Sequence, residues 1–284
     1  LDTANLELGT YQLTVTVAGP SIESASESGP EIEIVDPYGE SRSAVRQQIA
    51  TAEDALDEAM DNFENHTDGG PTATGNSGFD QTEMLRDARP AIEAVDDARE
   101  YDLEAIELES RIDYLETETE LVRAIARTQA DATEVYDRCS DIFTAYTEDI
   151  QSLETAQNNF DSSLTDFRSR VRNGSDSLED LESDVPTDTA QREYDEIIDA
   201  YNAEHDGFSD YVEIIEEDVY EGENELDDAR SFFDNEDYNS AQASAERAID
   251  AYESAIDNLD SIEPTALEDL INENIDLLED WIEE

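Results

Sequence analysis

Apolar residues alternate at spacings of three and four along most of the chain beyond residue 40. This pattern is typical of helices that pack along a narrow seam. The first series predicts a helix of roughly 25 residues that begins near Ser41, and it comprises Val45, Ile49, Ala52, Leu56, Ala59 and Phe63. Residues 66–79 hold four glycines and one proline, so we expect an exposed loop there.

The next 95 or so residues are nearly free of helix breakers, since residues 79–173 contain no glycine and a single proline, Pro90. We expect a helix that begins near Asp80, is kinked at Pro90 and continues toward Arg172. It would be divided if the polar seam at residues 116–120 marks a break.

The most regular seam lies at residues 136–171, where ten of eleven positions are apolar or aromatic. Its members are Tyr136, Cys139, Phe143, Tyr146, Ile150, Leu153, Gln157, Phe160, Leu164, Phe167 and Val171. Five heptads of this regularity predict coiled-coil-like packing with a left-handed twist, and they also offer a surface for self-association. Asn173 and Gly174 then predict the end of this helix.

Three more amphipathic segments follow. Residues 194–233 keep the seam spacing, residues 238–262 form a second series, and Pro264 is expected to start a last helix. The buried side of that helix would comprise Leu267, Leu270, Ile271, Leu278 and Trp281. Long helices joined by short turns bury such stripes together, so the predicted fold is mainly α: a long antiparallel helical bundle with coiled-coil-like packing.

The first 38 residues carry a different pattern. Apolar and polar residues alternate in two runs, Tyr11, Leu13, Val15 and Val17 in the first and Ile32 and Ile34 in the second, on either side of a Gly-, Pro- and Ser-rich connector. Two short strands are therefore expected as a small N-terminal β-hairpin. Because a lone hairpin is marginal in water, it would lie on the helices or complete a sheet with strands from upstream or from another chain.

The run LELGTYQLTVTV at residues 6–17 resembles a strand of the Ig-like β-sandwiches that are common in exported archaeal surface proteins. A small hairpin packed on the bundle explains the same residues. The expected organisation is thus a β-hairpin or β-sandwich remnant at residues 1–38 and an elongated antiparallel bundle at residues 39–284.

The charge of the chain tells more about its partners and its solvent than any sequence motif does. The 284 residues include 78 Asp and Glu against 15 basic residues, a formal net charge of −63, and every basic residue is Arg. Such a charge excludes nucleic-acid binding through a basic face and attraction to anionic membranes. Self-repulsion should open the chain at ordinary ionic strength, whereas molar salt shortens the Debye length to about 3 Å and screens it.

The excess of acids and the absence of Lys resemble the composition of proteins from salt-loving archaea. This resemblance implies a halophilic protein whose acidic surface holds water and solvent cations. An acidic tail or a DNA mimic from an ordinary cell is the alternative, but the acids here run through every segment. The compartment stays open between the cell exterior or surface and the cytoplasm of a salt-in archaeon.

No stretch predicts direct membrane insertion, because the longest uncharged run has only fourteen residues, 9–22. No signal peptide is visible. Since the chain opens at Leu1 without a Met, we expect that an upstream piece has been removed.

Candidate chemical groups are few. Cys139 sits at an apolar helix position, which predicts a packed thiol. His66 falls in the expected loop, and His205 falls on a helix seam, where a hydrogen-bonded imidazole in the core or at its boundary is expected. Neither histidine has a second ligand at zinc-binding spacing. With no nucleophile elbow, phosphate loop or dinucleotide fingerprint in the sequence, we predict no catalytic residue, metal site or cofactor.

Two further patterns are weaker signals. The acids Asp234, Glu236 and Asp237 lack calcium-loop spacing, so we expect only loosely held counterions there. Asn65 and Asn173 begin Asn-X-Ser/Thr triplets at predicted turns, which makes them candidate glycosylation sites in an exported protein.

Residues 225–256 resemble a single tetratricopeptide-type helix pair. Small and aromatic residues occupy the positions where two antiparallel helices approach closely, namely Ala229, Phe232, Tyr238, Ala241, Ala245, Ala248 and Ile249. No second copy follows at a period of about 34 residues. An ordinary helical hairpin with an alanine seam therefore explains the pattern as well.

The sequence as a whole predicts a non-catalytic halophilic scaffold, spacer or protein-interaction module that is exported or lies at the cell surface. Its partner would be an unidentified protein or a second copy. Two alternatives share the fold: an intracellular enzyme or regulator with a carboxylate-lined site, and an extracellular sensor bundle. Buried carboxylates in a cavity would favour the enzyme, and an elongated molecule with a filled core would favour the scaffold.

Overall fold

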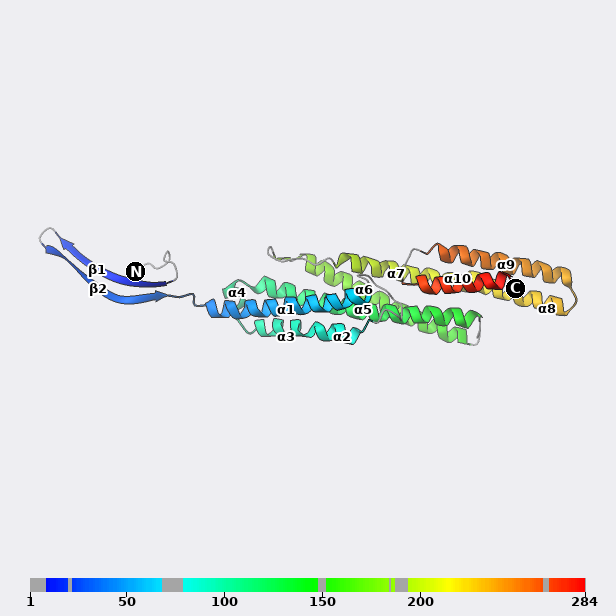
Figure 1. Ribbon diagram of the computed structural model, residues 1–284, viewed down its shortest axis with the longest axis horizontal. Helices are drawn as coiled ribbons and strands as arrows, with labels where there is room; N and C mark the ends of the chain where they lie inside the picture. The colour runs from blue at the N-terminus through cyan, green and yellow to red at the C-terminus, as the bar shows by residue number, and fades with distance from the viewer. Residues whose placement is uncertain are drawn as a thin grey trace.

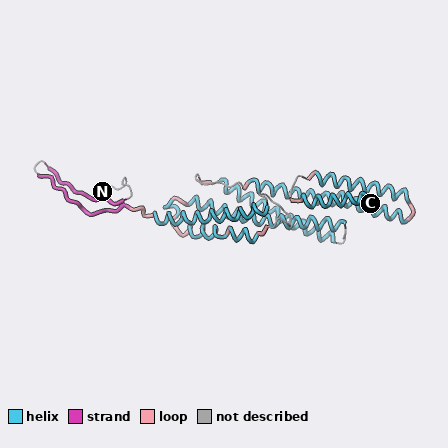
Figure 2. Tube along the Cα trace, viewed as in Figure 1, coloured by secondary structure: helices cyan, strands magenta, loops and turns pink. Residues whose placement is uncertain are grey.

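The computed structural model describes residues 9–19, 22–67, 79–147, 152–183, 185–186, 194–262 and 266–283. The chain forms a long rod of helices with a two-stranded hairpin beyond one end, as Figure 1 shows. Helix dominates the described residues, as the tube in Figure 2 makes plain. The predicted class, a mainly α antiparallel bundle with a small N-terminal β-hairpin, is confirmed.

The hairpin pairs β1 (Gly9–Gly19) with β2 (Ile22–Ile34) in antiparallel register, with Tyr11 opposite Ile32. The segment predicted to be a Gly-, Pro- and Ser-rich connector is part of β2, so that prediction is wrong. Serines of β2 lie opposite threonines of β1, and the hydroxyls of Thr16 and Ser26 are 3.4 Å apart. Such cross-strand pairs stabilise a ladder. The hairpin projects away from the helices and does not lie on them (Figure 1).

The half of the rod nearer the hairpin is built from α1 (Gly39–Thr67), α2 (Gln81–Asp87), α3 (Arg89–Ala98), α4 (Leu103–Ile106), α5 (Glu109–Thr147) and α6 (Leu153–Ser183). The predicted first helix is confirmed as α1, whose seam residues Val45, Leu56 and Phe63 are fully buried. α1 packs against α2, α3 and α5.

The predicted loop at residues 66–79 starts later than expected. His66 lies in the last turn of α1, where its Nδ1 is 2.8 Å from the carbonyl oxygen of Asn62. Its placement in a loop was therefore wrong. Residues 68–78 lie outside the described part of the chain, and Phe79 packs edge-on against Phe63.

A single kinked helix from residue 80 onward is not observed, and this prediction is wrong. α2 and α3 are separate helices that meet at Ala88, and Pro90 occupies the first turn of α3, where a missing backbone N–H is tolerated. The carboxylate of Asp80 accepts a hydrogen bond from the backbone N–H of Thr82 at 2.8 Å. This cap stabilises the start of a short helix.

The sequence left open a break at residues 116–120, and the structure shows none there, because these residues lie inside α5. Glu118 and Thr119 are buried there. The hydroxyl of Tyr194 donates to Glu118 at 3.1 Å, and the hydroxyl of Thr119 donates to the Leu115 carbonyl oxygen at 2.6 Å. The polar seam is therefore a set of buried hydrogen bonds and not a helix end.

The regular seam at residues 136–171 is divided between two helices instead of belonging to one. α5 and α6 are separated by residues 148–152 and lie side by side as an antiparallel hairpin (Figure 1). Phe143 is buried between them, and the side-chain amide of Gln157 donates to the Tyr146 hydroxyl at 3.1 Å. Ile150, a predicted seam residue, lies outside the described residues. Residues 148–152 contain no glycine or proline. The apolar spacing of the sequence therefore shows no break between the two helices.

α6 does not end at residues 173–174 as predicted, because it continues to Ser183. Gly174 is buried, and a methyl group built on it would lie 3.0 Å from Cδ1 of Ile198. The glycine therefore allows close packing of α6 against the following helix, which outweighs its low helix propensity.

The far half of the rod contains α7 (Asp195–Ile214), the π-helical turn η2 (Ile215–Val219), α8 (Tyr220–Asp234), α9 (Tyr238–Asp260) and α10 (Glu268–Glu283). α7, η2 and α8 follow without interruption, so the predicted long helix over residues 194–233 is confirmed. The expected last helix is α10, with Leu270, Ile271 and Leu278 buried. Pro264, its predicted start, lies outside the described residues.

A continuous hydrophobic core runs through both halves. Phe167 of α6 packs edge-on against Tyr201 and Phe208 of α7, with ring centroids 6.1 and 5.8 Å apart. Cys139 is fully buried within this core, and burial raises the pKa of its thiol well above the ordinary value. The predicted packed thiol is therefore confirmed, and the group is unsuited to act as a nucleophile.

Gly222 permits a close contact between α8 and α9. A methyl group built on it would overlap the ring of Tyr252. That ring packs against Trp281 at 5.6 Å, and its hydroxyl donates to Glu223 at 3.1 Å. We expect Gly222→Ala to lower the free energy of unfolding by about 2 kcal/mol, because overpacking exceeds the gain in helix propensity. Denaturant unfolding in molar KCl measures it.

Gly174→Ala is the matched control, since it is another buried glycine inside a helix. Its added methyl group would meet only the terminal methyl of Ile198, a flexible contact. We expect this substitution to change stability by less than about 1 kcal/mol in either direction. Equal losses at both glycines would contradict the explanation by the Tyr252 ring.

Candidate functional site

Buried polar pairs connect α7 with its neighbours α5 and α10. The hydroxyl of Tyr201 donates to the side-chain oxygen of Gln129 in α5 at 3.1 Å. The amide of Asn274 in α10 donates to the hydroxyl of Tyr211. Because burial raises the pKa of both tyrosines well above the ordinary value, they stay neutral. These pairs hold the helices in register, since breaking one would leave a buried polar group unsatisfied.

Glu204 of α7 is a carboxyl group with only 5% of its surface exposed. One oxygen accepts a hydrogen bond from the backbone N–H of Ala266 at 2.8 Å. The other has no hydrogen-bond partner among the described residues. Burial raises the pKa of Glu204 to about 7, while the Ala266 N–H opposes that rise. The group therefore changes charge near neutral pH.

The two buried carboxyl groups have separate structural partners. Glu118 in α5 accepts from Tyr194, and Glu204 binds the segment just before α10. An acid–base pair would need both carboxyls to face one ligand, and the described contacts do not bring these two together. Their environment is that of helix-positioning groups, which gives no support to a carboxylate-lined active site.

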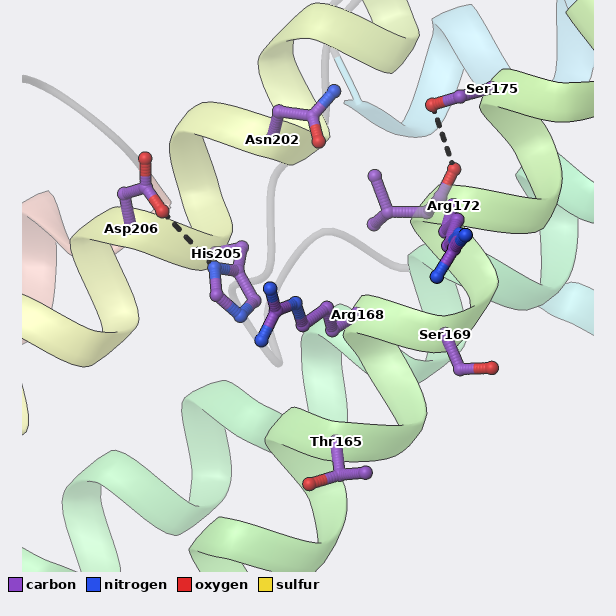
Figure 3. Close-up of a pocket in the computed structure, with 9 residues that line it drawn as sticks. Thr165, Arg168, Ser169, Arg172, Ser175, Asn202, His205 and Asp206 are labelled. Atoms are coloured by element: carbon purple, nitrogen blue, oxygen red, sulfur yellow. Dashed lines mark hydrogen bonds and ion pairs between the residues drawn. The ribbon is translucent and has the colours of Figure 1, made fainter.

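A groove of about 570 Å³ lies between α6 and α7, and Figure 3 shows the residues that line it. We call it the α6–α7 groove; its residues are Thr165, Arg168, Ser169, Val171, Arg172, Ser175, Asn202, His205 and Asp206. Arg168 and Arg172 are four residues apart and so share a face of α6. Arg168 extends toward the ring of His205 on α7 (Figure 3).

Local hydrogen bonds set the side chains of this groove. Nδ1 of His205 is 3.1 Å from a carboxylate oxygen of Asp206, and the ring is partly exposed. The amide of Asn202 donates to the Ile198 carbonyl oxygen at 3.1 Å. The sequence prediction of a hydrogen-bonded boundary imidazole at His205 is confirmed. The groove itself was not predicted, although Arg168 and its neighbours form the most basic stretch of the chain, RSRVR.

Arg168 and Arg172 differ from most arginines of the described residues because they have no ionic partner there. Ion pairs with carboxylates occupy nine arginines, at positions 42, 86, 89, 99, 111, 138, 170, 230 and 247. Arg170 pairs with Asp131 of α5 at 2.5 Å. Arg168 and Arg172, on either side of it, form no ion pair or hydrogen bond within the described residues. Two cationic side chains thus face an open groove on an acidic molecule.

The turn between α8 and α9 carries exposed aromatic residues at the end of the rod away from the hairpin (Figure 1). Phe233 is 62% and Tyr238 is 61% exposed, and their rings pack edge-on with centroids 5.6 Å apart. A shallow groove of about 650 Å³ adjoins them; it is lined by Ala229, Arg230, Phe233, Asp234, Tyr238, Ala241, Gln242 and Ala245. The predicted helix pair over residues 225–256 is this α8–α9 hairpin.

The candidate glycosylation sites lie on helices and not at turns. Asn65 is exposed in α1, and Asn173 is exposed in α6. The expectation of turns was wrong because α1 extends to Thr67 and α6 continues past Gly174. Their glycosylation itself stays a prediction.

Among the described residues, no three His, Cys, Asp or Glu side chains cluster so that they could hold a metal ion. Within the same residues, no helix is long and apolar enough to cross a membrane. Comparison of the chain with known protein families, with curated proteins and with solved structures yielded no match.

Proposed function

We propose that this chain is a non-catalytic helical scaffold or spacer that holds binding surfaces apart in a saline environment, at or outside the cell surface. The observation that carries the proposal is the elongated rod with a core running through both halves (Figure 1). A rod of this kind separates whatever binds at the hairpin from whatever binds near the α8–α9 turn.

Rigidity is the property that a spacer needs, and several features of the rod supply it. α5 has 39 residues, so it alone extends about 58 Å at 1.5 Å per residue. The continuous run of α7, η2 and α8 contacts α5 and joins α6 to α9. Buried pairs such as Tyr201 with Gln129 fix the register between the helices. Bending the rod would therefore break buried contacts.

The surface chemistry fits a halophilic molecule. Fifteen arginines can pair with at most a minority of the 78 carboxylates, and several described ion pairs are exposed. Unpaired carboxylates bind water and solvent cations, which keeps such a rod dissolved in brine. Export is part of this proposal because a spacer between surfaces is most useful outside the cell.

Small-angle X-ray scattering in molar KCl tests the spacer. A compact domain of 284 residues has a radius of gyration of about 19 Å, and an unfolded chain of that length about 59 Å. We expect a value clearly between these two, with the skewed distance distribution of a rod. A radius near that of a compact domain would contradict the proposal.

A pair of variants at Glu217, an exposed residue of η2, tests whether the continuous helix sets the length. Proline there removes a backbone donor and breaks the helix, whereas alanine does not. We expect Glu217→Pro to change the scattering profile and Glu217→Ala to leave it unchanged. Circular dichroism verifies that both variants remain helical.

A further inference from the structure

We propose that the α6–α7 groove binds a phosphate group, either inorganic phosphate or the terminal phosphate of a small ester. The groups that would hold it are the guanidinium groups of Arg168 and Arg172 and the imidazole of His205. This site lies on the side of the rod, and it neither requires nor follows from the spacer function.

The arginine pair is unfavourable without a ligand. Side chains four residues apart on a helix are neighbours, and like charges at that spacing repel each other. Carboxylates are abundant in this chain, yet neither Arg168 nor Arg172 has an ionic partner in the described part. Arg170, between them in sequence, points elsewhere and binds Asp131. An anion in the groove would relieve the repulsion.

A second pair of arginines differs from this one in the number of carboxylates that line the neighbouring groove. Arg123 and Arg127 of α5 are also four residues apart, and the described residues give them no ion pair. The groove beside Arg123, however, is lined by three carboxylates, those of Asp96, Glu116 and Glu120. The α6–α7 groove has a single lining carboxylate, Asp206, which is hydrogen-bonded to His205. An anion is therefore repelled less strongly in the α6–α7 groove.

The available groups suit a tetrahedral oxyanion that carries a hydroxyl. Each guanidinium presents five N–H donors in a planar fork that can bind two oxygens at once. His205 uses Nδ1 toward Asp206, and its Nε2 has no partner among the described residues. In the neutral ring whose Nδ1–H faces Asp206, Nε2 can accept the proton of a phosphate hydroxyl. A carboxylate ligand also binds guanidinium groups, but it has no hydroxyl to offer the Nε2 of His205.

The volume of the groove and the short range of electrostatic attraction in molar salt both agree with a phosphate ligand. The groove volume of about 570 Å³ exceeds what inorganic phosphate fills and lies within the range of small-molecule sites, so an ester fits as well. In molar salt, electrostatic attraction extends only about 3 Å. A ligand must then be held by hydrogen bonds in direct contact, which two adjacent guanidinium groups provide.

Isothermal titration calorimetry of the full chain in molar KCl tests the proposal with inorganic phosphate as the probe. We expect saturable binding to one site. The double variant Arg168→Gln/Arg172→Gln should bind at least about tenfold more weakly, because it loses charge-assisted hydrogen bonds. The matched control is Arg123→Gln/Arg127→Gln, which removes the same charge from α5 and should bind phosphate like the original chain. Circular dichroism verifies that both variants are folded.

Three further ligands at the same ionic strength refine the result. Tighter binding of AMP or pyrophosphate than of inorganic phosphate would support a site for the terminal phosphate of an ester or an anhydride, and the reverse order would support a site for the free anion. Sulfate has no hydroxyl to offer His205, so we expect it to bind more weakly. Equal binding of sulfate, equal losses in both double variants, or no phosphate binding by the folded chain would each overturn the proposal.

Discussion

In dilute buffer the purified chain is expected to lose most of its helix, and addition of molar KCl is expected to restore it. The net charge of −63 is distributed along the whole sequence. At an ionic strength of 0.1 M the Debye length is about 10 Å, so carboxylates on neighbouring helices repel one another. The narrow seams of this rod, many of them lined by alanine, offer little apolar area per residue to oppose that repulsion.

Far-ultraviolet circular dichroism across a KCl titration measures this effect. Two controls separate charge screening from other effects of salt. A neutral osmolyte such as sucrose, in dilute buffer, should restore less helix than KCl because it does not screen charge. Acidification to about pH 4 in dilute buffer should restore helix, because protonation removes carboxylate charges. Helicity that stays complete after desalting would contradict the halophilic account.

Replacement of Glu204 by glutamine should stabilise the protein above neutral pH. Burial raises the pKa of Glu204 from 4.5 to about 7, so the folded state binds a proton that the unfolded state releases between these two pH values. Stability from this group is therefore greatest below about pH 4.5, falls as the pH rises, and is lost above about pH 7. The shift corresponds to a penalty of about 3 kcal/mol in the folded state at alkaline pH.

The measurement is the free energy of unfolding of both forms in molar KCl at about pH 5 and about pH 8. The glutamine side chain would keep an acceptor for the Ala266 N–H and carry no charge, so the advantage of Glu204→Gln should grow toward about 3 kcal/mol between these pH values. Glu213→Gln, at an exposed position of the same helix, controls for the loss of one negative charge. A stability difference between the original chain and the Glu204→Gln variant that does not change with pH would refute the assignment.

Seam spacing predicted most of the helical residues, but not where individual helices begin and end or where the chain reverses. The residues at 136–171 face a neighbour on both sides of the reversal at residues 148–152, so their spacing is the same in one long helix and in two antiparallel helices. The polar seam near Glu118 was misread for a related reason: its partner, Tyr194, lies 76 residues further along the chain. Only tertiary structure identifies such a partner.

The α6–α7 groove could not be predicted from the sequence for the same reason, because only the tertiary structure brings its two helices together. The sequence shows Arg168 and Arg172 on one helical face, but it does not show that His205 lies opposite them or that Arg170 is neutralised by Asp131. Gly174 is informative in retrospect. The sequence pattern was interpreted as a stop at this glycine, but the contact with Ile198 shows that Gly174 allows close packing inside α6.

The antiparallel hairpin of α5 and α6 allows the length of this molecule to change by insertions. Because the two helices pack side by side, an insertion of seven residues in α5 and another at the facing position of α6 would keep the same faces of these two helices in contact. Each such double insertion would extend the hairpin by about 10 Å. The length of the rod can therefore change during evolution in steps of one heptad while the surfaces at its ends stay the same.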